Sequence, residues 1–191
     1  LYFWAPNNAA PSANLVEAAV TDFGIYFGWQ RNNVLVTDLA FQHQIDASIR
    51  MSGTFNVEVA NCTITDTHRA VYSTGSEQNF HDNTFARTYH TAVYLLDNNS
   101  TFRNNTITDV ALHPGLGENN WGYFGLRSNG SGMVVRDNRF ENIGYIAMVV
   151  EQNTLAEGNV VKEVLAILND GGGIAIDNAD GLVLRNNLVM D

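Results

Sequence analysis

The sequence predicts an all-β solenoid, because asparagine-containing phrases return at near-constant spacing and alternating apolar stretches lie between them. The phrases are NCTITD at 61–66, DNTFAR at 82–87, NNTITD at 104–109, DNRFEN at 137–142, GNVVKE at 158–163 and NNLVMD at 186–191. Equivalent positions in them are separated by 21, 22, 33, 21 and 28 residues, counted from Cys62 through Asn83, Asn105, Asn138, Asn159 and Asn187. A period in the low twenties is typical of stacked coils. We therefore predict a parallel β-helix of about seven coils, each of about 22 residues.

Each coil is predicted to contain three short strands joined by turns. The first strand is an alternating stretch, seen as GIYF 24–27, SIRM 48–51, AVYS 70–73, AVYL 92–95, YFGL 123–126, AMVV 147–150 and GIAI 173–176. The second is seen as NVLV 33–36, NVEV 56–59, GMVV 132–135 and GLVL 181–184, and the asparagine phrase supplies the third. Period-two alternation indicates half-buried strands. Helical spacing is absent over any useful length, which excludes crossover helices.

The recurring asparagine has a structural explanation. A sharp inward turn carries polar backbone groups that need partners where water is scarce. Asparagine amides stacked on successive coils can bond one another and the backbone, as in other asparagine ladders. Cys62 occupies the first such position, where a small buried thiol fits. A lone cysteine excludes a disulfide framework and a cysteine-based zinc site.

The chain is predicted to form one domain over residues 1–191, with an irregular leading segment at 1–23 and coils over 24–191. Solenoids need terminal caps that cover open strand edges. The sequence contains no capping helix at either end. We therefore expect an internal piece of a longer protein, incomplete at both ends.

Charge and hydropathy exclude two classes of partner. The formal net charge is −10, and no basic patch is available to meet phosphates, so nucleic acid is not an expected partner. No apolar run approaches the roughly 20 residues of a membrane-spanning helix, so no membrane insertion is expected.

The first strands predict an outward row of aromatic and basic side chains. Alternation points one set of residues away from the core. Aromatic faces with nearby polar groups suit sugar rings. Cross-coil stacking that stiffens the sheet is the alternative explanation. The row comprises Tyr26, Arg50, Tyr72, Tyr94, Tyr123 and Arg127.

The turns before these strands predict a groove. His68 and His90 each lie three residues before an equivalent valine, and Trp121, Tyr145 and Gly171 are expected in the same position of later coils. The two long insertions, 112–121 and 168–173, open on this edge, and insertions in solenoids often line the binding face. Alternatively, the histidines are ordinary turn residues. The groove is expected to comprise His68, His90, His113, Glu118, Trp121 and Asp170.

Four acids are candidates for catalysis. The stretch NDGGGIAIDN at 169–178 places Asp170 at a glycine-rich turn and Asp177 on the outward face. Glu151 lies one coil earlier in nearly the same column, and Glu118 lies in the first insertion. Glycosidases need two carboxylates that flank the scissile bond. The alternative role for each acid is to cap a turn, and the sequence leaves retaining and inverting mechanisms open.

These motifs resemble a known superfamily. The stretches LYFWAP at 1–6, GLRSNGSGMVVRDNRFENIG at 125–144 and LNDGGGIAIDNADGLVLRNNLV at 168–189 resemble the right-handed parallel β-helix proteins with pectate-lyase-like repeats. The chain is most similar to carbohydrate-active members of the glycoside hydrolase family 141 type. That resemblance implies a right-handed, single-stranded helix and makes Asp170 the first choice for a catalytic carboxylate. The chain departs from the family pattern at Ala175, a position that an aromatic residue often occupies.

The resemblance also implies a polysaccharide or oligosaccharide partner and an extracellular, periplasmic or cell-surface location. It implies no cofactor, with calcium left open. Glycoside hydrolysis is the leading hypothesis. A polysaccharide lyase or epimerase is an alternative, although lyase chemistry needs a basic proton abstractor and Lys162, the one lysine, falls outside the first strand. A non-catalytic carbohydrate-binding or structural module is the other alternative, and the oligomeric state is left open.

Overall fold

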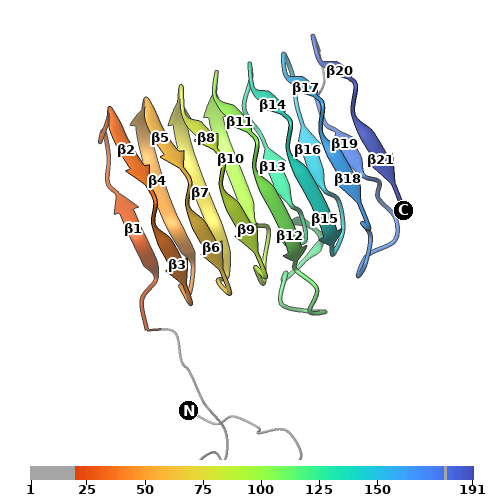
Figure 1. Ribbon diagram of the computed structural model, residues 1–191, viewed down its shortest axis with the longest axis horizontal. Coiled ribbons are helices and arrows are strands. Elements are labelled where there is room, and N and C mark those ends of the chain that lie inside the picture. Colours follow the sequence, from red (N-terminus) through yellow and green to blue (C-terminus); the bar gives the residue numbers. More distant parts are fainter. Residues whose placement is uncertain (1–19, 179) are drawn as a thin grey trace, which may run out of the picture.

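The computed structural model describes residues 20–178 and 180–191, and it confirms an all-β solenoid (Figure 1). Most of the leading segment predicted at 1–23 lies outside the described residues. Coils stack in sequence order, so that three parallel sheets of seven strands run along the rod. Each strand between the first and last coils pairs with the strand one coil earlier and the strand one coil later, which is the pairing that the repeat predicts.

The three sheets follow one another around each coil. The first sheet contains β1 (Phe23–Phe27), β4 (Ala47–Phe55), β7 (Arg69–Ser76), β10 (Val93–Asn98), β13 (Leu126–Ser128), β16 (Met148–Val150) and β19 (Ile174–Ile176). The second contains β2 (Val34–Thr37), β5 (Val57–Ala60), β8 (Asn79–His81), β11 (Thr101–Arg103), β14 (Val134–Arg136), β17 (Leu155–Glu157) and β20 (Val183–Arg185). The third contains β3 (Ala40–Gln42), β6 (Thr63–Thr65), β9 (Thr84–Ala86), β12 (Thr106–Val110), β15 (Arg139–Ile143), β18 (Val160–Lys162) and β21 (Leu188–Met190).

Every corner of the coil depends on a residue in the left-handed conformation. The non-glycine residues at these corners have φ between 51° and 65°. Asparagine, aspartate and glycine tolerate this region best, which explains their enrichment in the sequence. The corner before the second sheet uses Asn33, Asn56, Glu77, Asn99, Gly132, Asn153 and Gly181; the corner before the third uses Asp38, Asn61, Asp82, Asn104, Asp137, Gly158 and Asn186; the corner after the third uses His43, Asp66, Arg87, Asp109, Asn142 and Glu163.

The predicted asparagine ladder is present. The Asn83 side-chain amide donates to Asn105 Oδ1 at 3.0 Å and to the Val59 carbonyl at 2.9 Å. The same oxygen of Asn105 also accepts the backbone N–H of Asn83. The pattern continues through Asn138, Asn159 and Asn187. Cys62 begins the ladder as a buried free thiol, and its backbone N–H donates to Asn83 Oδ1.

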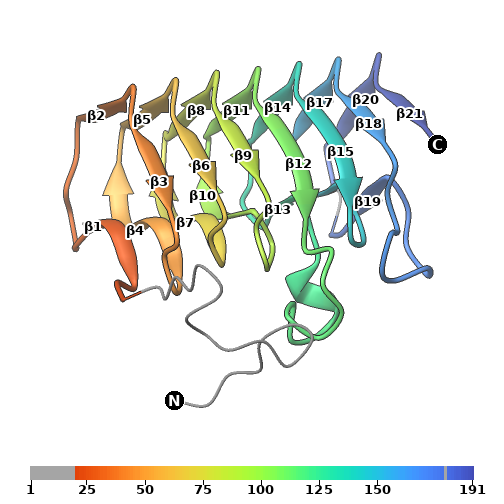
Figure 2. The ribbon, with the colours of Figure 1, turned by 60° about the horizontal axis from the view of Figure 1, so that its bottom comes forward.

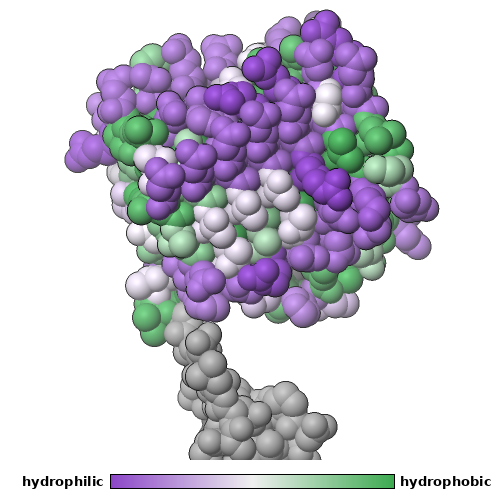
Figure 3. Space-filling model, in the orientation of Figure 1, coloured by the Kyte–Doolittle hydropathy of each residue, from purple (hydrophilic) through white to green (hydrophobic). Residues whose placement is uncertain are grey.

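Apolar side chains of successive coils stack inside the rod, along its axis. Phe80 pairs in register with Phe102 in the second sheet, and Phe85 pairs with Ile107 in the third. All four are fully buried. In Figure 3 hydrophobic surface gathers mainly towards the ends of the rod, and the exposed apolar residues of the last coil include Val183, Leu188 and Val189.

One carboxyl group lies inside this core. Asp97 is fully buried, and its Oδ1 accepts a hydrogen bond from Ser73 at 2.9 Å, whereas its Oδ2 has no partner. Burial raises the pKa of Asp97 to about 7, against the smaller opposing effect of the Ser73 hydrogen bond. A neutral carboxyl group avoids the cost of an unpaired buried charge.

We predict that Asn105→Leu lowers the free energy of unfolding by at least about 3 kcal/mol, because it strands buried polar groups that each cost about 1–3 kcal/mol. The groups are the Asn83 N–H, the Asn83 amide and the Phe80 carbonyl. Urea denaturation measures the change. Asn104→Gly, at the adjacent exposed left-handed position, is the control and is expected to stay within about 0.5 kcal/mol. Equal losses in the two variants would contradict the role of the ladder.

Asp97 is predicted to make stability depend on pH. Its folded-state pKa is raised, so the folded chain keeps a proton that the unfolded chain releases between about pH 4 and pH 7. The free energy of unfolding should therefore fall as pH rises through that window, by at most about 1.4 kcal/mol per unit. Asp97→Asn should remove this slope and be more stable than the parent above pH 7, whereas the exposed Asp137→Asn should change neither property. An unchanged slope in Asp97→Asn, measured by denaturation at several pH values, would exclude this explanation.

Candidate functional site

Two loops flank the outward face of the first sheet. One joins β12 to β13 and contains the 3-10 turn η3 (Asn120–Gly122), and the other joins β18 to β19. Figure 2 shows both loops projecting on the same side of the rod. The turn that contains Tyr145, between β15 and β16, belongs to the coil between them. The two predicted insertions therefore border one region of the molecule.

The outward row on the first sheet is built as predicted through Tyr94 and then continues with Arg127. Register places Tyr72 beside Tyr94 and Tyr94 beside Arg127. The two tyrosine rings meet edge to face at 5.3 Å. The Arg127 guanidinium lies 4.9 Å from the Tyr94 ring centroid and 4.1 Å from that of Trp121. Such stacking holds the rings and the cation in place.

The placement of Tyr123 in this row is wrong. Tyr123 is 5% exposed, and its hydroxyl accepts the Gly115 N–H at 2.7 Å. Strand β13 begins only at Leu126, and Leu126 instead of Phe124 pairs with Val93, so the register is displaced by two residues from the predicted one. By that register Tyr123, and not Trp121, takes the position of His68 and His90. Trp121 is instead 46% exposed beside Arg127.

A second outward row brings two of the predicted acids together. Val150 pairs with Ile176, so Glu151 and Asp177 are neighbours on adjacent coils, as the sequence predicted. Glu151 is 8% exposed, whereas Asp177 is exposed. The Asn129 side-chain amide donates to Glu151 Oε1. Burial raises the pKa of Glu151, and the negative charge of Asp177 raises it further, while Asn129 and Arg127 oppose the shift.

An apolar hollow of about 190 Å³ adjoins this pair. Aromatic and aliphatic side chains form most of its lining, and Asp177 is its one acidic residue. Asp170 reaches the same region through the Tyr145 hydroxyl, which donates a hydrogen bond to its carboxylate. The tyrosine leaves no room for a side chain at Gly171, where a Cβ would lie 2.5 Å from the ring. The lining residues are Trp121, Phe124, Tyr145, Ile146, Val149, Ala175, Ile176 and Asp177. We call this hollow, with Glu151, Asn129 and Arg127, the cleft.

The sequence of this chain is matched over residues 47–191 by the model of the right-handed β-helix region family. The chain belongs to that family. Among curated proteins no sequence matches it closely enough to count as a relative. Membership in the β-helix family accounts for the fold, and the site must be judged on its own chemistry.

In this β-helix protein His68 and His90 lie outside the lining of the cleft, and His90 lies against Gly122, next to Trp121. His68 and His90 rings are 4.8 Å apart, and Arg69 Nη2 donates to His90 Nδ1 at 3.2 Å. Burial, together with Arg69 and then His68, lowers the pKa of His90 to about 3, and burial and Arg69 also lower that of His68. Glu118 is near enough to act electrostatically on His68 and Arg69. Both rings are therefore neutral near pH 7. Because neither histidine lines the hollow, the residues predicted to form one groove do not all lie in one site.

His113 is separated from the other residues of the predicted groove. It packs against Tyr89, at 5.8 Å between ring centroids, in a different pocket at the end of the third sheet. Its loop runs from that corner to the first sheet, so residues from one insertion reach two sites. The sequence placed His113 and Trp121 in one groove because it could not show where this loop turns.

Sequence reasoning missed Asn129 and Phe124. Asn129 follows Arg127 by two residues, so the period-two alternation already present in the sequence would have placed it beside Glu151. Phe124 was assigned to a strand, but it lies in the inserted loop and packs edge to face on Trp121 at 5.9 Å. No pattern in the sequence predicts that contact.

Across the residues that the structure describes, no group of three or more histidine, cysteine, aspartate or glutamate side chains is arranged to hold a metal ion. Nor does any helix in that part of the chain have the length and apolar character needed to cross a membrane. The lone lysine, Lys162, is paired with Glu141 and Glu163 on the third-sheet side of the rod.

We predict that the pKa of Glu151 is raised from its ordinary value and that its neighbours Asp177 and Asn129 shift it in opposite directions. Asp177→Asn should lower its pKa by removing a like charge, and Asn129→Ala should raise it by removing a donor to the carboxylate. NMR titration of the side-chain carboxyl carbons measures both shifts. Asp180→Asn, an exposed change in the coil of Asp177, should leave the titration midpoint of Glu151 unchanged. Shifts of the same sign in Asp177→Asn and Asn129→Ala would contradict the described geometry.

Proposed function

We propose that this β-helix protein is carbohydrate-active and hydrolyses glycosidic bonds of a polysaccharide in the cleft. The observation that carries the proposal is the Glu151–Asp177 pair beside an aromatic-walled hollow on the outward face of the first sheet. Glycoside hydrolysis uses two carboxyl groups, one of which must hold a proton near neutral pH. A long open face also suits an extended polymer better than a small enclosed substrate.

Glu151 is the proposed proton donor. Its environment is nearly buried and carries the like charge of Asp177, and both effects favour the protonated form. The amide of Asn129 fixes the orientation of the carboxyl group through its bond to Oε1. Protonation of the glycosidic oxygen by Glu151 would let the leaving sugar depart as an alcohol.

Asp177 is the proposed second carboxylate. It is exposed and belongs to the lining of the hollow, so it stays accessible to the sugar. Neighbouring strands lie roughly 4.8 Å apart. Parallel side chains on adjacent coils therefore favour the roughly 5–5.5 Å separation of retaining enzymes over the roughly 6.5–9.5 Å of inverting ones. We accordingly propose Asp177 as the nucleophile of a retaining mechanism.

The aromatic residues supply binding. Trp121 presents an exposed ring over the hollow, and sugar C–H faces pack on such rings. Tyr72 and Tyr94 extend the same face along the rod for further sugar units. Asp170, the first choice from the resemblance, is assigned to orienting Tyr145, which belongs to the lining of the hollow. A polysaccharide substrate would place the protein outside the cell, in the periplasm or on a cell surface.

A non-catalytic binding module is the second candidate. The observation that favours it is the close stacking of Arg50 on Tyr72, at 3.8 Å, and of Arg127 on Tyr94 and Trp121. These contacts form a stiff, continuous face that can hold a glycan without any reaction. A lyase or epimerase has less support, because the side chains around the Glu151–Asp177 pair are acidic and amide groups, with Arg127 as the nearest base in the row.

The test is a panel of xylans, fucosylated glycans, pectins and alginate, in which new reducing ends and unsaturated uronate absorbance are followed together. We expect reducing ends without unsaturation, and a loss of at least about 100-fold in Glu151→Gln and Asp177→Asn, because acid–base catalysis alone contributes about 10²–10⁴-fold. Asp180→Asn is the matched control and should keep full activity. Proton NMR of the first product anomer distinguishes retention from inversion.

Other outcomes separate the alternatives. Unsaturated products would overturn hydrolysis and favour a lyase. Binding without reaction, abolished by Trp121→Ala, would favour the module. Loss of activity in Asp170→Asn but not in Asp177→Asn would move the second carboxylate to Asp170.

A further inference from the structure

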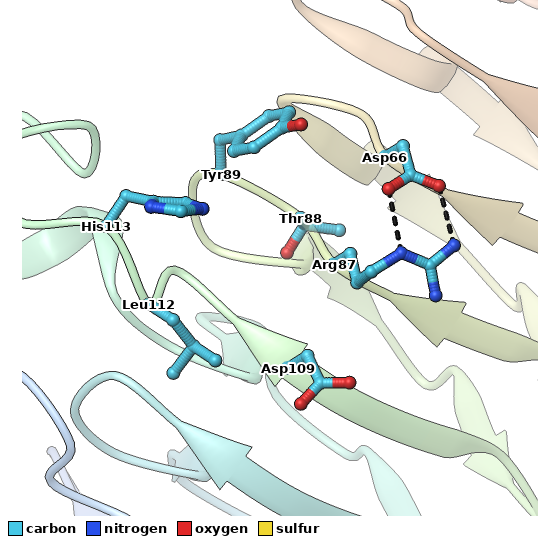
Figure 4. A pocket seen from close by; sticks show the side chains of 7 residues that line it. All are labelled: Asp66, Arg87, Thr88, Tyr89, Asp109, Leu112 and His113. Carbon is cyan, nitrogen blue, oxygen red and sulfur yellow. Dashed lines mark hydrogen bonds and ion pairs between the residues drawn. The ribbon is translucent and has the colours of Figure 1, made fainter. Parts of the chain in front are cut away.

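A second pocket lies at the corner where strands of the third sheet end. Its volume is about 390 Å³, within the range of roughly 300–1,000 Å³ that small-molecule sites occupy. Its lining comprises Asp66, Arg87, Thr88, Tyr89, Asp109, Leu112 and His113, none of which lines the cleft (Figure 4). The pocket opens where the insertion leaves β12, so a regular coil would not create it.

One side of the pocket is formed by rings. Tyr89 and His113 lie 5.8 Å apart between ring centroids and are tilted by 38°, and Leu112 extends the apolar wall. Figure 4 shows both rings on the side opposite Asp66 and Arg87. Tilted rings beside an aliphatic group suit the C–H faces of a sugar ring.

The other side is polar and already organised. The Arg87 guanidinium bonds both oxygens of Asp66, at 2.8 and 2.6 Å, and this pair holds the planes of the two groups in place. The Arg87 side chain remains 54% exposed and Asp66 24%. Asp109 is fixed by the Asn142 amide, which donates to Oδ1 at 2.7 Å. Paired planar groups of this kind can bond neighbouring sugar hydroxyls.

The charges select the ligand. Asp66 and Arg87 neutralise each other, and Asp109 leaves the pocket with a net negative charge. A uronate, sulfate or phosphate group would meet that charge and would have to compete with Asp66 for Arg87. A neutral sugar places hydroxyls there without such a conflict.

We propose that this pocket is a second saccharide site, specific for a neutral sugar unit and separate from the cleft. The inference rests on the lining of this pocket and does not require the cleft to be catalytic. The site lies on another face of the coil, so it would hold a segment of glycan other than the one in the cleft.

The experiment uses the Asp177→Asn protein, so that the proposed cleavage would not consume the probe. It is titrated with xylohexaose, cellohexaose, mannohexaose and hexagalacturonate up to millimolar concentration. Amide shift changes in NMR locate the binding. We expect a neutral oligosaccharide to shift residues 87–89 and 109–113 and to bind at least fivefold more tightly than hexagalacturonate. Adding Tyr89→Ala to the Asp177→Asn protein should weaken that binding at least fivefold. Adding Asp109→Asn should also weaken it.

Trp29→Ala is the matched control, because Trp29 is an exposed aromatic residue between β1 and β2 that lines neither the pocket nor the cleft and lies outside the outward row. It should leave the affinity unchanged. Absence of shifts at the pocket for every neutral probe would overturn the proposal. Equal or tighter binding of hexagalacturonate would overturn the specificity of the pocket. Equal effects of Tyr89→Ala and Trp29→Ala would overturn the role of the rings.

Discussion

Hydrogen bonding between parallel coils fixes the position of almost every other group in this molecule. Each strand must lie one strand spacing from its equivalent, and each corner must therefore turn through the same backbone conformation. That requirement is met by one left-handed residue at each corner. It also places Asn83, Asn105, Asn138 and Asn159 directly above one another, where each amide satisfies a neighbour. The stacks of phenylalanine, the asparagine ladder and the outward rows all follow from the same alignment of the coils.

Regular coils could be predicted from the sequence because they repeat. The strand positions, the buried asparagines and the Glu151–Asp177 neighbourhood all follow from period and alternation. The prediction failed where the period is broken. Tyr123 looked like a strand residue because YFGL resembles the start of other coils, but the chain enters the strand only at Leu126. The positions of His113 and Trp121 depend on the path of the inserted loop, which cannot be predicted from the repeat.

The cleft and the second pocket have a common origin in that loop. The coil that follows β12 is longer than its neighbours, and its extra residues carry His113 to one corner and Trp121 to the first sheet. Both aromatics are thereby placed beside side chains that the regular coils already present. Without this loop, Arg127 and Glu151 would be ordinary members of outward rows, and Asp66 and Arg87 would be ordinary corner residues. A single insertion is therefore sufficient to turn two parts of a repetitive surface into distinct sites.

The outward rows have a consequence for how such a surface can change. Side chains in one row are separated by multiples of roughly 4.8 Å, because the strands that carry them cannot slide without breaking the ladder. A ligand with a different repeat length cannot be accommodated by small backbone shifts. It can be met only by choosing which coils carry a contact residue, or by adding or removing a complete coil. Because every regular coil ends with the same three corners, such a change would lengthen or shorten the surface in whole steps while the inward and outward faces of the remaining residues stay as they are.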